Sequence, residues 1–230
     1  GLACDLRGVG GGLSVDLTYA GGMTPEITDP RFQKIADDIK NDPENASFTK
    51  RGIDPLFFAG PDCRIMIVGQ APGRVAEETG IVWNDRSGDR LRDWMGVDRE
   101  IFYDVSRIAI APMGFCFPGN DAAGGDLPPR RECRATWHDA LFAELPQIET
   151  VLAIGRYAQA YHFARLGHDL PKGASVSHSV ARWRDFQDGR PLIFPLPHPS
   201  WRNTGWLKRN PWFEAEVLPA LRAEVARLVK

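Results

Sequence analysis

The sequence predicts an α/β fold, a three-layer α/β/α sandwich around a short, mainly four-stranded parallel sheet. Four short and continuous apolar runs, at 64–69, 107–112, 150–155 and 192–197, are typical of strands that are buried on both faces. Segments with helical hydrophobic spacing lie between these runs. An alternation of strands and helices produces a parallel sheet with helices on both of its faces.

The elements follow in order along one expected domain, residues 23–230. The glycine-rich, aperiodic residues 1–22 are expected to be a leader added before a native start at Met23. Residues 25–62 are polar and helical in part. Beyond the first strand, the predicted helices are Ser87–Trp94, Arg131–Leu145, Arg156–Leu166 and Trp212–Val229.

Bulk composition limits the class of protein without identifying it. The formal net charge of −2 means that any surface for nucleic acid must be a local concentration of cations. The four cysteines form no CxxC pair, so a disulfide framework is not expected. No apolar run approaches the roughly 20 residues that span a bilayer. We therefore expect a cytoplasmic, reduced protein, monomeric and without a membrane partner.

The segments that follow the strands are the candidates for function, because ligands of such folds bind beyond the carboxyl ends of the strands. These segments read GQAPGR (69–74), MGFCFPGN (113–120), GRYAQ (155–159) and HPSWRN (198–203). The last one continues to Trp212 with further tryptophans and cations, which is an unusual composition for a simple turn.

Two of these segments resemble the signature motifs of the uracil-DNA glycosylase superfamily. VGQAPGR ends the first strand and HPSWRN follows the last, and the resemblance runs from about residue 64 to the C-terminus. It is closest to the family 4 branch, which usually has glutamate at the position of Gln70. The resemblance implies a monofunctional DNA glycosylase that flips uracil, or another deaminated base, out of DNA and hydrolyses its N-glycosidic bond.

Two departures from that branch are visible. The branch carries a four-cysteine iron–sulfur cluster, whereas Cys116 and Cys133 match only its later ligands, and Cys4 and Cys63 form no close pair. We therefore expect no 4Fe-4S cluster, no other cofactor and no metal. Many members also place an asparagine after the second strand to read the uracil edge, and the segment APMGFC lacks one.

Three residues are the candidates for catalysis. His198, held between two prolines, can donate a hydrogen bond to the departing base, which leaves as an anion. Gln70 carries both a donor and an acceptor for the base or for water. Asp85 can orient the attacking water, or it can instead cap the helix that follows it.

A second group is expected to form the base pocket. Trp83 falls where the family stacks an aromatic ring on the flipped base, although it can equally be a core residue. Asn84 can replace the missing asparagine. The backbone of the first motif completes the pocket, and Ala71 stands where the best-known members carry a water-activating aspartate; the motif residues are Gly69, Ala71, Pro72 and Gly73.

The last segment is expected to contact DNA. Trp201 or Arg202 lies where the superfamily inserts a side chain into the gap that the flipped base leaves. Cations can neutralise phosphates, and small polar side chains can donate to the backbone oxygens of DNA; the remaining candidates are Ser200, Asn203, Lys208 and Arg209. Trp206 and Trp212 are expected to anchor this segment by packing.

The other candidates are weaker. The four remaining histidines, His138, His162, His168 and His178, lack metal-ligand spacing and are interpreted as structural or surface residues. Residues 119–131 predict a mobile loop beside the site, which can close over the base, contact DNA or simply be flexible.

Two alternative functions remain open. A catalytically weak or inactive module of the same fold can bind damaged or single-stranded DNA, and the absence of a carboxylate at Ala71 and of the asparagine after the second strand favours this alternative. A hydrolase of free nucleosides or nucleotides can use the same pocket, but it has no need of a basic, tryptophan-rich segment.

Overall fold

The computed structural model describes residues 24–230, apart from the side chains of residues 134 and 135. The expected leader, residues 1–22, and Cys4 lie outside the described residues. None of the helices described is both long enough and apolar enough to cross a bilayer.

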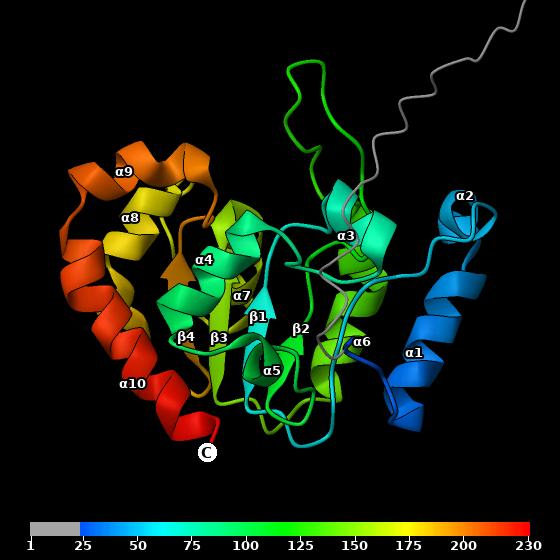
Figure 1. The fold of residues 1–230 in the computed structure, drawn as a ribbon, viewed down its shortest axis with the longest axis horizontal. Coiled ribbons are helices and arrows are strands. Elements are labelled where there is room, and N and C mark those ends of the chain that lie inside the picture. Colours follow the sequence, from blue (N-terminus) through cyan, green and yellow to red (C-terminus); the bar gives the residue numbers. More distant parts are fainter. Residues whose placement is uncertain (1–23) are drawn as a thin grey trace, which may run out of the picture.

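A four-stranded parallel sheet forms the centre of the fold, as predicted (Figure 1). Its strands are β1 (Ile65–Val68), β2 (Ile108–Ile110), β3 (Thr150–Ile154) and β4 (Leu192–Leu196). Their order in the sheet is β2-β1-β3-β4. Each strand lies within one of the four apolar runs, and nearly every strand residue is buried, because helices cover both faces.

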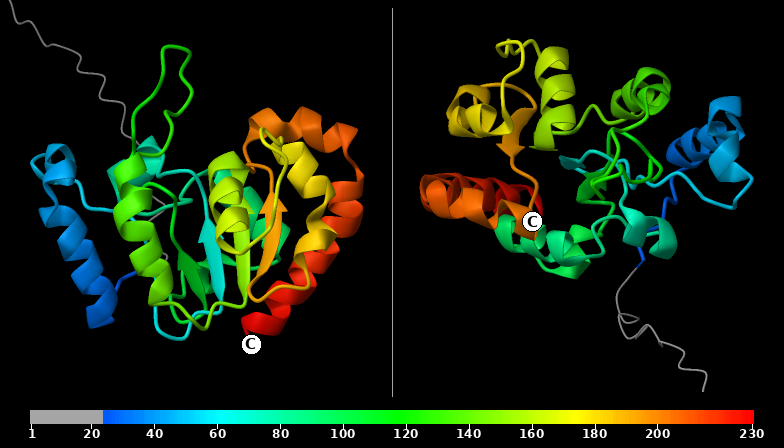
Figure 2. Two further views of the ribbon diagram at one scale, coloured as in Figure 1. Left: turned by 180° about the vertical axis from the view of Figure 1, so that it is seen from behind. Right: turned by 90° about the horizontal axis from the view of Figure 1, so that it is seen from above.

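The two faces of the sheet pack against different helices (Figure 2). Side chains that alternate along each strand divide between two apolar clusters, as the period of two requires. One cluster includes α4 (Arg86–Met95) and α10 (Leu218–Leu228). The other includes α1 (Pro30–Asn41), α6 (Asp139–Ala143) and α7 (Gly155–Arg165). The three-layer prediction is therefore confirmed.

The predicted helices are present, with differences at their starts. Those at 87–94 and 156–166 correspond to α4 and α7. Those at 131–145 and 212–229 include the π-helical segments Cys133–His138 and Phe213–Val217, which precede α6 and α10. Pro219 lacks an N–H and cannot continue the α-helical ladder, which accounts for the wider turn before α10.

The sequence prediction missed the short helices, because four to six residues are too few to display helical spacing. They are α2 (Ala46–Thr49), α3 (Arg74–Thr79), α5 (Arg99–Phe102), α8 (Val176–Ala181) and α9 (Thr204–Arg209). The 3₁₀ segments Pro43–Asn45, Trp183–Phe186 and Trp201–Asn203 were also missed. The segment after β4 is consequently helical from Trp201 to Arg209, in two short pieces.

An ion-pair network ties the amino edge of the sheet to α10. Arg64, which precedes β1, donates through Nε to Glu149 at 2.7 Å, and Arg227 on α10 donates to the same carboxylate at 3.0 Å. Hydrogen bonds from Arg64, and then from Arg227, lower the pKa of Glu149. A lowered pKa means that the network stabilises the fold above the pKa of the unfolded chain and loses this effect in acid.

We predict that Glu149→Gln lowers the free energy of unfolding at pH 7 by up to about 1 kcal/mol, the upper end for a partly exposed ion pair. The difference from wild type should disappear as the pH falls through the lowered pKa of Glu149, because the wild-type carboxylate is then protonated. Denaturant unfolding at several pH values measures it. Glu78→Gln, at an exposed glutamate without an ion pair in residues 24–230, is the control. A deficit that persists in acid would contradict the assignment.

Candidate functional site

A cavity of about 280 Å³ lies where the loops after β1 and β4 meet the segment between α3 and α4. This volume is slightly below the roughly 300–1,000 Å³ of pockets for drug-sized ligands, so it suits a single heterocycle. Both sequence motifs contribute to its wall. The lining residues are Gly69, Gln70, Ala71, Gly73, Arg74, Val75, Ala76, Val82, Trp83, Asn84, Asp85, Pro112, Asp126 and His198.

Trp83 is fixed in the cavity wall by an unusual backbone conformation. Its φ of 61° lies in the left-handed region, which side-chain-bearing residues rarely adopt. A Cβ built on Gly88 would lie 1.7 Å from the Trp83 carbonyl oxygen, and one built on Gly69 would lie 3.1 Å from its indole ring. Arg92 donates to the same carbonyl at 3.2 Å. Two glycines therefore leave the room that Trp83 occupies, and one arginine fixes its carbonyl group.

His198 lies next to this indole. The two ring centroids are 5.4 Å apart, with an interplanar angle of 34°. The imidazole is open to solvent at the mouth of the cavity, but the surrounding protein atoms desolvate it and lower its pKa. Asp85 and Asp126 act in the opposite direction without reversing this shift. The imidazole is therefore neutral at pH 7, when one ring nitrogen donates and the other accepts.

The loop that carries His198 is held by polar side chains. Asn203 donates through its amide to the His198 carbonyl oxygen at 2.7 Å. Arg90 on α4 donates to the Ser200 carbonyl oxygen at 3.0 Å. The amide of Asn203, a candidate for DNA contact, is thus used to shape the loop.

Three further candidates line the cavity, and each of them already forms a hydrogen bond within the protein. Gln70 donates through Nε2 to the Leu127 carbonyl oxygen at 2.8 Å, and its own oxygen has no partner within residues 24–230. The Asn84 oxygen accepts from Arg99 at 2.9 Å, and its Nδ2 has no partner in the same part of the chain. One Asp85 oxygen accepts from the Gly88 amide at 2.9 Å. Asp85 is therefore the helix cap that the sequence allowed, and it also faces the cavity.

Asp126 is a cavity residue that sequence reasoning missed. It lies on an arm that projects beyond α3 in Figure 1. This arm was predicted as a mobile loop, but Asn120 pairs with Asp126 across it in an antiparallel bridge. Only this folding back brings Asp126 to the cavity, and no motif or spacing marks it in the sequence.

The expected DNA-contacting side chains lie on the 3₁₀ segment after β4 and on α9. Trp201 has 73% of its surface exposed, which is exceptional for a large apolar side chain. Arg202, Lys208 and Arg209 are exposed, and within residues 24–230 none of them forms a salt bridge. Trp206 and Trp212, in contrast, pack on the core and on each other with ring centroids 5.8 Å apart.

The remaining histidines do not form a metal site among the described residues, where no group of three metal-ligating side chains occurs. His138 and His162 are fully buried, with their Nε2 atoms 3.2 Å apart. Burial lowers the pKa of His138 to about 3 and that of His162 in the same direction, so both rings are neutral.

The described cysteines do not provide the donor set of a four-thiolate cluster. Cys63 precedes β1, at the amino edge of the sheet, and contacts Gly60 and Gln147. Cys116 follows β2, at the opposite edge, near Cys133. Cys63 is therefore separated from the other two described cysteines, which lie at the opposite edge of the sheet.

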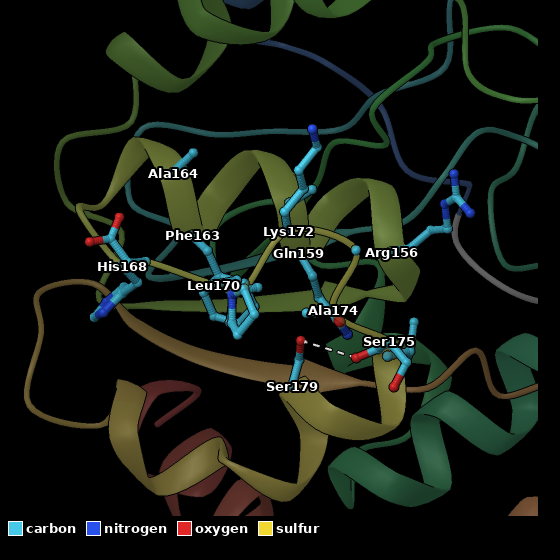
Figure 3. A pocket seen from close by; sticks show the side chains of 15 residues that line it. Arg156, Gln159, Phe163, Ala164, His168, Leu170, Lys172, Ala174, Ser175 and Ser179 are labelled. Carbon is cyan, nitrogen blue, oxygen red and sulfur yellow. Dashed lines mark hydrogen bonds between the residues drawn. The ribbon is translucent and has the colours of Figure 1, made fainter.

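A larger cavity, of about 770 Å³, lies between α7 and the segment that leads into α8 (Figure 3). It contains no residue of the first or last motif. Its buried amide, Gln159, already donates to the carbonyl oxygens of Ala153 and Leu196. We place the candidate site in the smaller cavity because that one gathers both motifs.

Comparison with known proteins identifies the family of the chain. A sequence profile of the uracil DNA glycosylase superfamily matches residues 57–222, which is 166 of 230 residues. The chain is also similar to the solution NMR structure of a Methanosarcina acetivorans protein assigned provisionally as a uracil DNA glycosylase. The two share 14% identity over 73% of this chain and 94% of the other, with a TM-score of 0.45.

We predict that Gly88→Ala destabilises the protein by about 3 kcal/mol, because the added methyl overlaps the Trp83 carbonyl and must displace it. Gly69→Ala should cost less, about 1 kcal/mol, because an indole edge can shift where a carbonyl cannot. Denaturant unfolding measures both. Gly73→Ala, whose methyl meets nothing within 4 Å, is the control. Equal stability of Gly88→Ala and wild type would contradict the wedging of Trp83.

Proposed function

Because the chain belongs to the uracil DNA glycosylase superfamily, we propose that it is a monofunctional DNA glycosylase that removes uracil or another deaminated base from DNA. The superfamily resemblance read from the two motifs is thereby confirmed, whereas the likeness to the family 4 branch stays a prediction. The observation that carries the proposal is the pairing of Trp83 with His198 in one base-sized cavity. A base inside this cavity has left the duplex stack, so the reaction proceeds by base flipping.

In the proposed complex the base is held on its face and along its edge. The indole of Trp83 offers the stacking surface, and base–aromatic stacking is worth roughly 1–3 kcal/mol per base. The free Nδ2 of Asn84 and the free oxygen of Gln70 offer one donor and one acceptor to the edge. Asn84 thus takes the part of the asparagine that is missing after β2.

His198 stabilises the departing base. When the N-glycosidic bond breaks, the bonding electrons remain on the base, and negative charge develops on its oxygens. A neutral imidazole can donate a hydrogen bond to such an oxygen without first releasing a proton. The Asn203 and Arg90 hydrogen bonds fix the loop beforehand, so little reorganisation is needed during the reaction.

The segment after His198 is the proposed DNA surface. Trp201, three residues after the cavity residue His198, is largely exposed and can fill the gap in the duplex after the base has flipped. Arg202, Lys208 and Arg209, free of salt bridges in residues 24–230, can neutralise phosphates. We propose that neither a metal nor an iron–sulfur cluster takes part, since the described cysteines lie at opposite edges of the sheet.

A second candidate function is supported by Ala71, which leaves the first motif without a carboxylate. A chain of this fold that cannot activate water would bind damaged or single-stranded DNA without turnover. It would retain the cavity, the exposed Trp201 and the cations, and it would release no base.

We predict that wild type forms abasic sites in a single-turnover assay on uracil-containing single- and double-stranded oligonucleotides, revealed by alkali cleavage. His198→Ala should lower the rate about 10²- to 10³-fold, the usual loss when one donor to a developing anion is removed. His178→Ala, at an exposed histidine on α8 outside the cavity, is the matched control and should keep the wild-type rate.

A different result is that wild type binds DNA in a salt-dependent manner and releases no product from uracil, hypoxanthine or xanthine substrates. That result would identify the chain as the binding module and not the enzyme. Equal rates for His198→Ala and His178→Ala would remove His198 from the mechanism while leaving the enzyme.

We predict a strand-dependent effect for Trp201→Ala. A wedge is needed only where a neighbouring stack must be kept open, so excision from duplex should fall about tenfold and excision from single strands should change little. Thermal unfolding should be unchanged, because the side chain is largely exposed. The same assay on both substrates gives the ratio, and an equal loss on both would argue against the wedge.

A further inference from the structure

Hydrolysis of a glycosidic bond requires a water molecule held at the sugar, and the first motif offers no group to deprotonate it. Ala71 is apolar, and the amide of Gln70 is not a base. The Nε2 of Gln70 is also engaged with the Leu127 carbonyl oxygen at 2.8 Å. Any base for the water must therefore come from another part of the cavity wall.

Two carboxylates line the cavity together with His198, those of Asp85 and Asp126. Both act electrostatically on the same imidazole. Asp85 already serves as the cap of α4, where its Oδ1 accepts from the Gly88 amide at 2.9 Å. The structural task of Asp85 is the cap of α4, whereas Asp126 caps none of the described helices and pairs with Asn120 within its own arm.

The arm that carries Asp126 is docked against the first motif. Besides the Gln70 contact to Leu127, Arg74 on α3 donates to the Asn120 oxygen at 3.1 Å. Asn120 in turn donates through Nδ2 to the Asp126 Oδ1 at 3.0 Å. Asp126 is thus held through Asn120 and through the docking of its arm on the first motif, and its second oxygen has no hydrogen-bond partner among the described residues.

We infer that Asp126 is the catalytic carboxylate that orients and deprotonates the attacking water, an inference that rests on the proposed glycosylase function. The water oxygen bonds to the anomeric carbon of the deoxyribose, and the carbon–nitrogen bond to the base breaks. The bonding electrons leave on the base, which His198 stabilises, and the proton of the water passes to Asp126. The base anion is later protonated by solvent, so no oxidant, reductant or metal is required.

The groups that face Asp126 come from three other elements. Arg74 lies on α3, Asp85 at the start of α4, and His198 after β4. Arg74 supplies the positive charge and Asp85 the negative charge, while His198 is neutral at pH 7. Asp126 must be ionised to accept a proton, so the rate should rise with pH until its carboxyl group is fully ionised.

The test is the single-turnover rate of uracil excision from single-stranded DNA, measured across pH for wild type, Asp126→Asn, Asp85→Asn and Asp121→Asn. Each asparagine keeps an acceptor oxygen for the existing hydrogen bond and removes only the charge. Asp121 is the matched control, because it lies on the same arm, accepts from the Ala123 and Gly125 amides, and does not line the cavity. Binding to an oligonucleotide that contains uncleavable 2′-fluoro-2′-deoxyuridine is measured in parallel.

We predict that Asp126→Asn lowers the rate at least 100-fold, as expected for loss of a general base, and removes the rise with pH. Its dissociation constant for the uncleavable oligonucleotide should stay within about threefold of wild type, a range that excludes loss of the pocket. Asp121→Asn should behave as wild type.

Three results would overturn the inference. One is a rate for Asp126→Asn that matches that of Asp121→Asn. Another is loss of the pH-dependent rise in Asp85→Asn alone, which would assign the water to Asp85. The last is a slow Asp126→Asn that keeps the wild-type pH dependence, which would indicate a purely structural role. Failure of wild type itself to release the base would instead overturn the proposed function, and the inference with it.

Discussion

The site depends on how tightly the backbone packs around Trp83. Its carbonyl lies against the first turn of α4, where only a glycine at position 88 leaves room for it, and its indole reaches the backbone of Gly69 at the end of β1. This packing forces Trp83 into the left-handed region, at a cost of order 1–3 kcal/mol for a residue with a side chain. This packing joins the end of β1 and the start of α4 into one rigid wall of the cavity. The position of the indole, and with it the width of the cavity, is set before any ligand arrives.

The electrostatics of the cavity follow from its concave shape. His198 is reached by solvent and yet is surrounded by enough protein for its pKa to fall, despite two carboxylates in the same wall. A positively charged imidazole would attract an anion more strongly, but it would also be neutralised by Asp85 and Asp126 before a base arrived. A neutral donor leaves both carboxylates available for other work, and its hydrogen bond strengthens only as charge develops on the base.

The sequence contained most of the fold and about half of the site. Buried parallel strands are apolar throughout and helices of ten residues show their spacing, so β1 to β4, α4 and α7 were predictable. His198 was found because its motif follows a strand end, and Trp83 because the resemblance places an aromatic ring at its position. Side-chain partners were not predictable: the Gln70 contact joins residues 57 positions apart, and Asn203 turns back to its own loop. Asp126 was missed for a related reason, since only the folding of a glycine-rich arm brings it to the cavity.

The same contact gives a physical meaning to Gln70. Its amide donates to the Leu127 carbonyl oxygen, whereas a glutamate at this position, being only an acceptor when ionised, would repel that oxygen. An amide at position 70 therefore adds to the docking of the arm, which Arg74 also holds through Asn120, and the docked arm brings Asp126 into the cavity. The two departures in the first motif are then linked. Ala71 removes a carboxylate from the end of β1, and Gln70 helps to supply one from the arm. With glutamate at position 70, the arm and its Asp126 would depend on the hydrogen bond from Arg74 to Asn120 without this second support.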